Sequence, residues 1–225
     1  MVESTQTAAA AGKTLNLVIF GATGGSGIEL CKQAVEAGHR VTAYVRNPDK
    51  LTIESENLVK VKAELNDEAA MDAAIKDKDA VLCSLGGKGL LSRDTTCSVG
   101  TKAIVNSMKK QGVNRLIVLS SYGVGPGNRS LLPWAIRGML YHPLADKDDQ
   151  EALVVASGLD YTIVRPPRLV DKPAQGTWVA LEAGRVPHME ISRADVATFM
   201  LKSLYENTWV KMTPHLSWPA PNAAK

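Results

Sequence analysis

The sequence predicts a single α/β domain, built as a doubly wound parallel sheet flanked by helices. From Leu15 onward, short β-branched runs alternate with longer segments of helical periodicity, the pattern of strands joined by crossover helices. Residues 79–85 are nearly all apolar, as central strands of a parallel sheet are, because both of their faces are buried. A length of 225 residues suits one large domain of this kind.

Six strands are predicted from apolar runs of strand length. They lie over residues 15–20, 41–45, 58–63, 79–85, 115–121 and 161–165. Segments of helical periodicity separate most of these strands. The predicted helices are one that follows residues 21–27 and ends near Gly38, three over residues 68–76, 95–111 and 147–157, and a last one that begins at Ser192.

Local signals mark several ends of these elements. Gly112 directly follows a predicted helix, where a residue that tolerates positive φ is common. Pro166 and Pro167 stop the sixth strand because proline cannot donate to a hydrogen-bond ladder. Ser192 and Asp195 form a capping-box pattern at the start of the last helix. The apolar stripe of that helix comprises Val196, Phe199, Met200 and Leu204.

Two segments fall outside this alternation. Residues 1–14 are expected to form a flexible N-terminal tail, and residues 15–225 form the domain. Within the domain, residues 122–145 are rich in Gly and Pro and are interpreted as an insertion. The sequence leaves open whether its larger side chains wall a substrate pocket or belong to the core; they are Trp134, Met139, Tyr141 and His142.

Composition and charge exclude several classes of protein. Hydrophobic residues at 45% and charged residues at 22% are typical of a soluble globular chain. The net charge of +3 comes from scattered residues, so no charge block favours nucleic acid or a membrane surface. No apolar stretch approaches the ~20 residues that cross a bilayer, and residues 1–14 lack the pattern of a secretory signal.

The cysteines indicate a reducing compartment. Cys31, Cys83 and Cys97 are odd in number and widely spaced, which fits free thiols better than a disulfide framework. A cytoplasmic location is therefore expected, with Cys31 and Cys83 as small core residues. No His, Asp and Glu cluster has the spacing of metal ligands, so no metal is expected.

The most informative segment is GATGGSG, residues 21–27, between the first strand and the first helix. Gly21 allows a tight exit from the strand, Gly24 allows close approach of a pyrophosphate, and Gly27 allows the helix to pack near the sheet. The alternative is a glycine-rich turn without a ligand, but the strand and helix on either side favour a dinucleotide. No Gly-Lys-Ser/Thr closes the segment, which excludes a nucleotide P-loop.

The end of the second strand favours NADP(H) over NAD(H). NAD-binding proteins carry an Asp or Glu about 20 residues after the glycine-rich turn, to hold the ribose 2′-hydroxyl. Residues 39–48 contain no carboxylate, and Arg46 stands where the strand is expected to end. An arginine fork there can bind a 2′-phosphate. The alternative is that Arg46 is only a solvated surface residue.

Four segments resemble those of the atypical short-chain dehydrogenase/reductases. They are GATGGSG, VRNP at 45–48, SGLDYTIVRPP at 157–167 and ISRADVATFML at 191–201. Within that superfamily the chain is most similar to the biliverdin reductase B/flavin reductase group, with NmrA-like proteins as relatives. The resemblance covers residues 15–204 and implies a Rossmann fold that binds NADP(H).

The resemblance also implies which residues contact the cofactor. The phosphates would lie against Gly21, Thr23, Gly24, Gly25, Ser26 and Gly27, and the 2′-phosphate would meet Arg46. Glu64 and Leu65 would flank the adenine, while Leu85 and Gly86 would lie under a ribose. Near the nicotinamide it would place Ser120, Ser121, Pro166, Pro167 and Arg168.

One departure from the superfamily concerns catalysis. Most members use a Tyr-x-x-x-Lys pair, in which the lysine lowers the pKa of the tyrosine for proton transfer. None of the five tyrosines here has a lysine four residues later, and the residue four before Lys147 is Pro143. The mammalian flavin reductases carry a histidine where this chain has Arg168, which puts reduction of bilins in doubt.

The missing proton donor favours one class of chemistry. Reduction of a simple ketone needs a placed acid, whereas a conjugated acceptor can delocalise the charge that hydride transfer brings. The hypothesis is an NADPH-dependent oxidoreductase that reduces a flavin-like or other conjugated small molecule, with water or Ser121 assisting proton delivery. The alternative is an NmrA-like NADP(H) sensor or scaffold without turnover. A monomer is the expected state.

Overall fold

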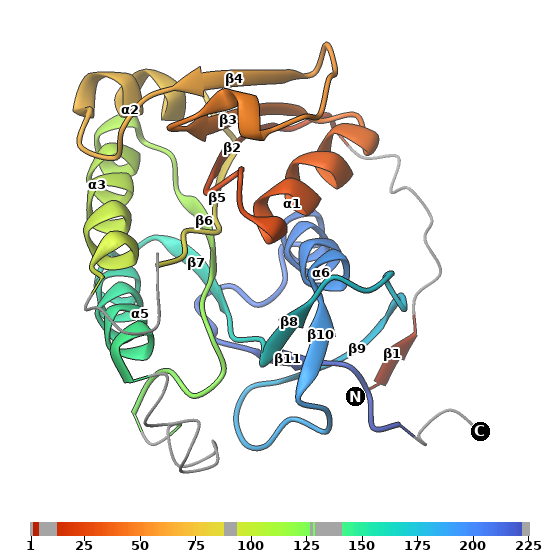
Figure 1. The fold of residues 1–225 in the computed structure, drawn as a ribbon. Helices are drawn as coiled ribbons and strands as arrows, with labels where there is room; N and C mark the ends of the chain where they lie inside the picture. The colour runs from red at the N-terminus through yellow and green to blue at the C-terminus, as the bar shows by residue number, and fades with distance from the viewer. Residues whose placement is uncertain (1, 5–12, 88–93, 127, 129–140, 222–225) are drawn as a thin grey trace.

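The computed structural model describes residues 2–4, 13–87, 94–126, 128 and 141–221 (Figure 1). Its centre is a six-stranded parallel sheet in the order β4-β3-β2-β5-β6-β7. These strands are β2 (Asn16–Phe20), β3 (Arg40–Val45), β4 (Leu58–Lys62), β5 (Ala80–Cys83), β6 (Arg115–Leu119) and β7 (Asp160–Val164). The order grows outward from β2 in one direction and then from β5 in the other, which confirms the predicted doubly wound sheet.

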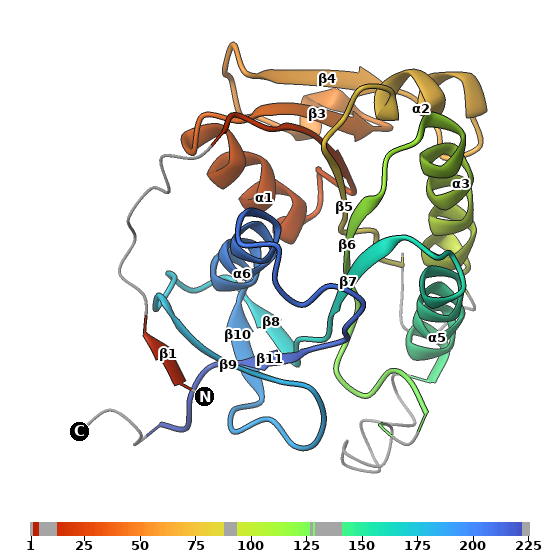
Figure 2. The ribbon, with the colours of Figure 1, turned by 180° about the vertical axis from the view of Figure 1, so that it is seen from behind.

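Helices cover both faces of the sheet, as Figures 1 and 2 show. One face carries α1 (Gly25–Glu36) and α6 (Arg193–Tyr205), which pack on each other. The other carries α2 (Glu68–Ile75), α3 (Thr96–Gln111) and α5 (Tyr141–Val155). A short 3-10 turn, η1 (Pro48–Lys50), joins β3 to β4. Where the structure describes the chain, no helix is long and apolar enough to cross a membrane.

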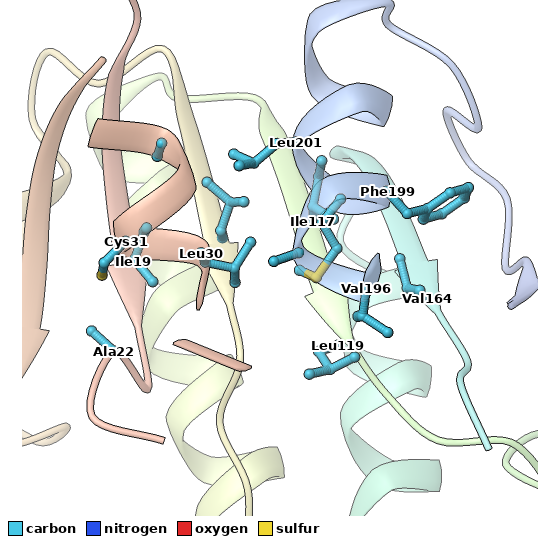
Figure 3. Packing of buried hydrophobic residues seen from close by; sticks show 14 of the residues in the cluster. Ile19, Ala22, Leu30, Cys31, Ile117, Leu119, Val164, Val196, Phe199 and Leu201 are labelled. Carbon is cyan, nitrogen blue, oxygen red and sulfur yellow. The ribbon is translucent and has the colours of Figure 1, made fainter. Parts of the chain in front are cut away.

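The core lies in two layers because the strands bury both of their faces. Ile19 and Ile117 belong to the layer on the side of α1 and α6, in one cluster with Leu30 and Val196 (Figure 3). Their neighbours in sequence point to the opposite layer, against α2, α3 and α5. This two-sided burial explains why the central runs lack the alternation of a half-exposed strand.

The three cysteines are free and buried within these layers. Burial raises the pKa of the Cys31 and Cys97 thiols to about 12 and also raises the pKa of Cys83. All three are therefore protonated thiols at neutral pH, and the expectation that Cys31 and Cys83 are core residues is confirmed.

Several element ends follow the sequence signals. Gly112 has a φ of +71° at the end of α3, and β7 ends at Val164, just before the two prolines. The helix predicted over residues 147–157 instead spans Tyr141–Val155, so part of the proposed insertion over 122–145 belongs to α5. The rest of that insertion, apart from residues 122–126 and 128, lies outside the described residues, including Trp134 and Met139.

Five short strands were not predicted, because most of them are only three residues long. β8 (Arg168–Val170) pairs in parallel with β10 (Glu190–Ser192). β1 (Val2–Ser4) and β11 (His215–Ser217) pair antiparallel with β9 (Thr177–Leu181). The expected flexible tail over 1–14 therefore differs from the structure at residues 2–4; residue 1 and residues 5–12 lie outside the described residues.

Asp195 joins α6 to the segments around these small sheets. The Ser192 hydroxyl accepts from the Asp195 amide at 3.0 Å, as the capping pattern predicts. The Asp195 carboxylate, which is fully buried, accepts from the amides of Gln175 and Gly176 and from Trp218 Nε1 at 2.7 Å. The acid thus fixes the start of α6 to two distant parts of the chain.

His215 gives the fold a testable pH dependence. Burial, and then the nearby charge of Arg165, hold the pKa of His215 below its ordinary 6.5. The folded chain then binds fewer protons than the unfolded chain, so stability falls as the pH drops below 6.5 toward the folded pKa. Burial also lowers the pKa of His39, which adds to the same effect. Each histidine contributes at most about 1.4 kcal/mol per pH unit.

We expect His215→Asn, which keeps a donor for the Gly184 carbonyl oxygen, to make stability less pH-dependent. The measurement is the free energy of unfolding in urea between pH 6.5 and pH 5. Carboxylates with lowered pKa values lose their contribution only below about pH 4.5 and so do not interfere; they are Asp72, Asp79 and Glu190. An unchanged slope in the variant would show that His215 is not the titrating group.

Candidate functional site

The turn between β2 and α1 is held by backbone packing that only glycine permits. Gly21 has a φ of +75°, and a Cβ there would lie 2.6 Å from the carbonyl oxygen of Ser84. The Gly24 amide donates to the Gly21 carbonyl oxygen at 3.0 Å, and the Ser84 hydroxyl donates to that of Phe20 at 3.0 Å. A Cβ at Gly27 would lie 2.1 Å from the Gly21 carbonyl oxygen, so α1 begins in direct contact with the turn.

The N-terminus of α1 is left open by the side chains that the structure describes. Gly24 occupies the N-cap position with no side-chain cap, and the first turn holds no acidic residue. Other helices are capped: Asp67 caps α2, and the buried Asp146 carboxylate accepts from the amides of Cys97 and Ser98 at the start of α3. Uncapped amides at the positive end of a helix favour an anion, so this turn fits the diphosphate of a dinucleotide.

A cleft of about 990 Å³ opens beside this turn. Its lining comes from the turn itself, from the carboxyl ends of β3, β4, β5 and β6, and from one side of α3. It lies at the switch between β2 and β5, the place of the ligand crevice in open α/β sheets. The volume is at the upper end for small-molecule sites and suits a dinucleotide.

The charged side chains of the lining are mainly cations. They are Arg46, Lys50, Lys102, Lys147 and Arg193, against the carboxylates of Glu64 and Glu68. This excess favours a ligand with several negative charges. Within the part of the chain that is described, no group of three or more His, Cys, Asp or Glu residues could hold a metal ion.

One end of the cleft lies at the ends of β3 and β4. Arg46 directly follows β3 and is exposed, with Lys50 nearby in the lining. Tyr44 also lines this end, and its hydroxyl donates to the Glu64 carbonyl oxygen at 2.7 Å. Burial, together with the charges of Asp67 and Glu64, raises the pKa of Tyr44 to about 12. The Tyr44 hydroxyl therefore stays protonated at neutral pH and donates its hydrogen to the backbone.

Lys147 lies at the other end, between β5 and β6. Its ammonium group donates to the carbonyl oxygens of Leu85 at 2.9 Å and Leu119 at 2.7 Å, and to Gln150 Oε1 at 2.9 Å. Three hydrogen bonds fix a positive charge in the lining. The sequence drew attention to Lys147 only through a missing tyrosine partner, and its contacts with two strand ends depend on the tertiary fold.

Ser120 belongs to a buried network behind the same end. Its hydroxyl donates to the Glu151 carboxylate. Arg165, at the end of β7, donates through Nε to both oxygens of Glu151, at 3.0 and 3.2 Å. All three residues are buried. The ion pair therefore fixes the direction of the Ser120 hydroxyl proton, away from any ligand.

Most of the residues implied by the resemblance line the cleft. They are Gly21, Thr23, Gly24, Gly25, Ser26, Arg46, Glu64, Leu65, Leu85, Gly86 and Ser120. Gly27 lies beneath the turn. Sequence reasoning missed or set aside Lys50, Lys102, Lys147, Leu169 and Arg193, which also belong to the lining. Tyr141 and His142 are not among the described lining residues.

Besides Gly27, four predicted residues are not brought to the lining. Successive residues along and beyond β6 face opposite sides, so Ser120 faces Glu151 while Ser121 turns away and donates to the Tyr122 carbonyl oxygen at 3.4 Å. Pro166 and Pro167 fall between β7 and β8, and Arg168 forms an exposed ion pair with Glu190 at 2.9 Å. Leu169 is the residue of that segment that reaches the cleft.

Several known proteins resemble this chain in sequence or in fold. A probable pinoresinol-lariciresinol reductase of Arabidopsis thaliana is 24% identical over 92% of this chain and 69% of its own length. ChuY, an anaerobillin reductase from Escherichia coli O157:H7, superimposes with a TM-score of 0.80 at 21% identity, covering 93% of this chain and 99% of that one. A short-chain dehydrogenase/reductase from Veillonella parvula, solved in complex with NADP, gives a TM-score of 0.78 at 16% identity, covering 95% and 98%.

At these identities the two structures establish the shared fold. The family is established separately, because residues 21–207 match the model of a family described as NAD(P)H-binding. That match begins at Gly21, directly after β2, and spans the other five strands of the sheet and both helical layers. The chain belongs to the NAD(P)H-binding family of Rossmann-fold proteins.

Proposed function

We propose that the protein is an NADPH-dependent oxidoreductase that reduces a conjugated small molecule, such as a flavin. The observation that carries the proposal is the distribution of polar groups in the cleft. Cations line it from end to end, with Lys147 fixed by three hydrogen bonds. Tyr44, the one tyrosine among the described lining residues, lies at the end away from Lys147, and its hydroxyl donates to the backbone. The site offers positive charge but no phenolic acid.

The cofactor runs along the cleft in this proposal. The amides of α1 hold the diphosphate, while Arg46, with Lys50 beside it, takes the 2′-phosphate. Glu64 and Leu65 flank the adenine. The nicotinamide end meets Leu85, Gly86 and Ser120. When bound, NADPH supplies the hydride; the chain positions it and its acceptor.

The chain's own groups at the nicotinamide end stabilise charge rather than supply protons. Lys147 holds a fixed positive charge where negative charge develops on the acceptor. The Ser120 hydroxyl donates its hydrogen bond to Glu151, so its oxygen can accept a hydrogen bond from the carboxamide N–H₂ of the nicotinamide. Because Ser121 lies outside the lining, we assign proton delivery to water. An acceptor that delocalises charge is the kind that such a site can reduce.

Similar proteins support a reductase. ChuY and the probable pinoresinol-lariciresinol reductase are both named as reductases, and the Veillonella protein was solved with NADP. We place the chain nearest the biliverdin reductase B/flavin reductase group within the wider family, with a small-molecule substrate. The competing proposal is an NADP(H) sensor, which needs the same phosphate turn.

Turnover separates these two functions. We expect loss of NADPH absorbance when the protein is mixed with FMN, riboflavin, a quinone or dichlorophenolindophenol, and slower or no turnover with simple ketones. The Lys147→Met variant, which removes the fixed charge, should lower kcat with these acceptors. Micromolar NADPH binding without turnover of any acceptor would favour the sensor.

The choice of coenzyme depends on Arg46. We expect Arg46→Ala to weaken NADPH binding by about 1.5 to 3 kcal/mol, the range for a hydrogen bond to a charged group, and to leave NADH binding unchanged. The measurement is the dissociation constant from fluorescence titration. Arg40→Ala is the matched control, because Arg40 is also exposed but begins β3, at the opposite end of the strand. An equal loss of affinity for NADPH and NADH in Arg46→Ala would show that Arg46 does not bind the 2′-phosphate.

The placement of the diphosphate depends on Gly24. A Cβ there would have its nearest contact at 3.4 Å, so Gly24→Val should lose only about 1 kcal/mol of stability, the usual cost of a poor N-cap residue, yet obstruct coenzyme binding. Gly27→Ala is the contrasting variant, because overpacking against Gly21 should destabilise the fold by roughly 1 to 3 kcal/mol. Normal NADPH binding by a folded Gly24→Val variant would contradict the placement.

A further inference from the structure

Arg193 lies across the glycine-rich turn from the far side of the cleft. It is the first residue of α6, and its side chain belongs to the lining although the sequence places it about 170 residues after the turn. A Cβ on Gly25 would lie 2.7 Å from Arg193 Cδ and 2.8 Å from Nε. The stem of the arginine therefore rests on the backbone of Gly25, at the open N-terminus of α1.

The base of this side chain is held rigidly. Ser192 caps α6 immediately before Arg193, and the buried Asp195 carboxylate ties the same turn to Gln175, Gly176 and Trp218. An arginine so mounted loses little freedom when its guanidinium group engages a ligand, which favours binding.

The Arg193 guanidinium group forms an ion pair with an exposed carboxylate. Arg193 Nη1 donates to Asp171 Oδ1 at 2.7 Å, and the Asp171 side chain is 84% exposed, against 27% for Arg193. An ion pair with so exposed a carboxylate contributes little net stability. A diphosphate offers more charge, held against the positive end of α1, and phosphate oxygens match the arginine fork.

We propose that Arg193 is a side-chain ligand of the cofactor diphosphate, closing from α6 the anion site that the α1 amides open. This inference rests on the proposed function and adds to it a contact from the C-terminal half of the chain. It also explains why residue 25 is a glycine, since the arginine stem occupies the space that a Cβ would need. Asp171 holds the guanidinium group near the turn until the diphosphate replaces it.

The test compares Arg193→Gln with Arg185→Gln, which makes the same charge change at an exposed residue absent from the described lining. Dissociation constants are measured by fluorescence titration and thermal shift for NADPH, NADH and ADP-ribose. We expect Arg193→Gln to weaken all three by a similar factor of about ten or more, since all share the diphosphate, and Arg185→Gln to weaken none. Arg46→Ala should instead affect NADPH alone, so the two arginines give different patterns.

Two further variants exclude a merely structural role. Asp171→Asn breaks the ion pair but leaves the guanidinium group, so it should keep wild-type affinity or bind slightly more tightly. Arg193→Lys retains the charge without the guanidinium fork, so its affinity for the three ligands should lie between those of wild type and Arg193→Gln. This variant still tests the proposal if Arg193→Gln folds poorly.

Other results overturn the inference. Unchanged dissociation constants in Arg193→Gln would do so, as would a loss confined to NADPH and NADH with normal ADP-ribose binding, which would place the arginine at the nicotinamide. A loss of equal size in Asp171→Asn would assign the effect to the ion pair. If wild-type protein binds none of the three ligands, the proposed function fails as well, whereas failure of Arg193 alone leaves it standing.

Discussion

The contact between the start of α1 and the end of β2 is the constraint on which the site depends. A Cβ on Gly27 would lie 2.1 Å from the Gly21 carbonyl oxygen, and a Cβ on Gly21 would lie 2.6 Å from that of Ser84, so neither position admits a side chain. This packing brings the first amides of α1 to the edge of the sheet. A longer or looser turn would move those amides away from the strand ends that supply the rest of the cleft. The same contact sets where a diphosphate can lie, and hence which strand ends its two halves can reach.

The positive charge of the cleft comes from residues that lie far apart in the sequence. Arg46 and Lys50 follow β3, Lys102 lies on α3, Lys147 on α5 and Arg193 on α6. The cations are scattered along the sequence and the net charge is only +3, yet these five side chains share one concave surface. Electrostatic attraction for a multiply charged ligand therefore depends on tertiary structure, not on the overall charge of the chain.

Prediction succeeded where the determining interaction is local. The six parallel strands follow from burial on both faces, the turn from its glycines, and the cap of α6 from Ser192. It failed for three-residue strands such as β8, whose pairing with β10 comes from a distant segment. It also placed Ser120 and Ser121 together near the nicotinamide, whereas only Ser120 lies in the described lining, because the side to which each serine points depends on how the end of β6 packs against α5. The position of Arg193 in the cleft could not be predicted, because its contact with Gly25 joins segments far apart in the sequence.

The hydrogen bonds already made by polar groups at the Lys147 end of the cleft limit the chemistry that the proposed function allows. The Lys147 ammonium group donates its three hydrogen bonds to Leu85, Leu119 and Gln150, and the Ser120 hydroxyl donates to Glu151. To release a proton from either, the site would have to break a hydrogen bond that also orders a strand end or a buried ion pair, at a cost of about 1 to 3 kcal/mol. A ketone would require that release at the moment of hydride transfer, when its oxygen becomes strongly basic. A conjugated acceptor spreads the charge under the fixed field of Lys147 and can take its proton later from water, so the arrangement that removes one class of substrate is the one that serves the other.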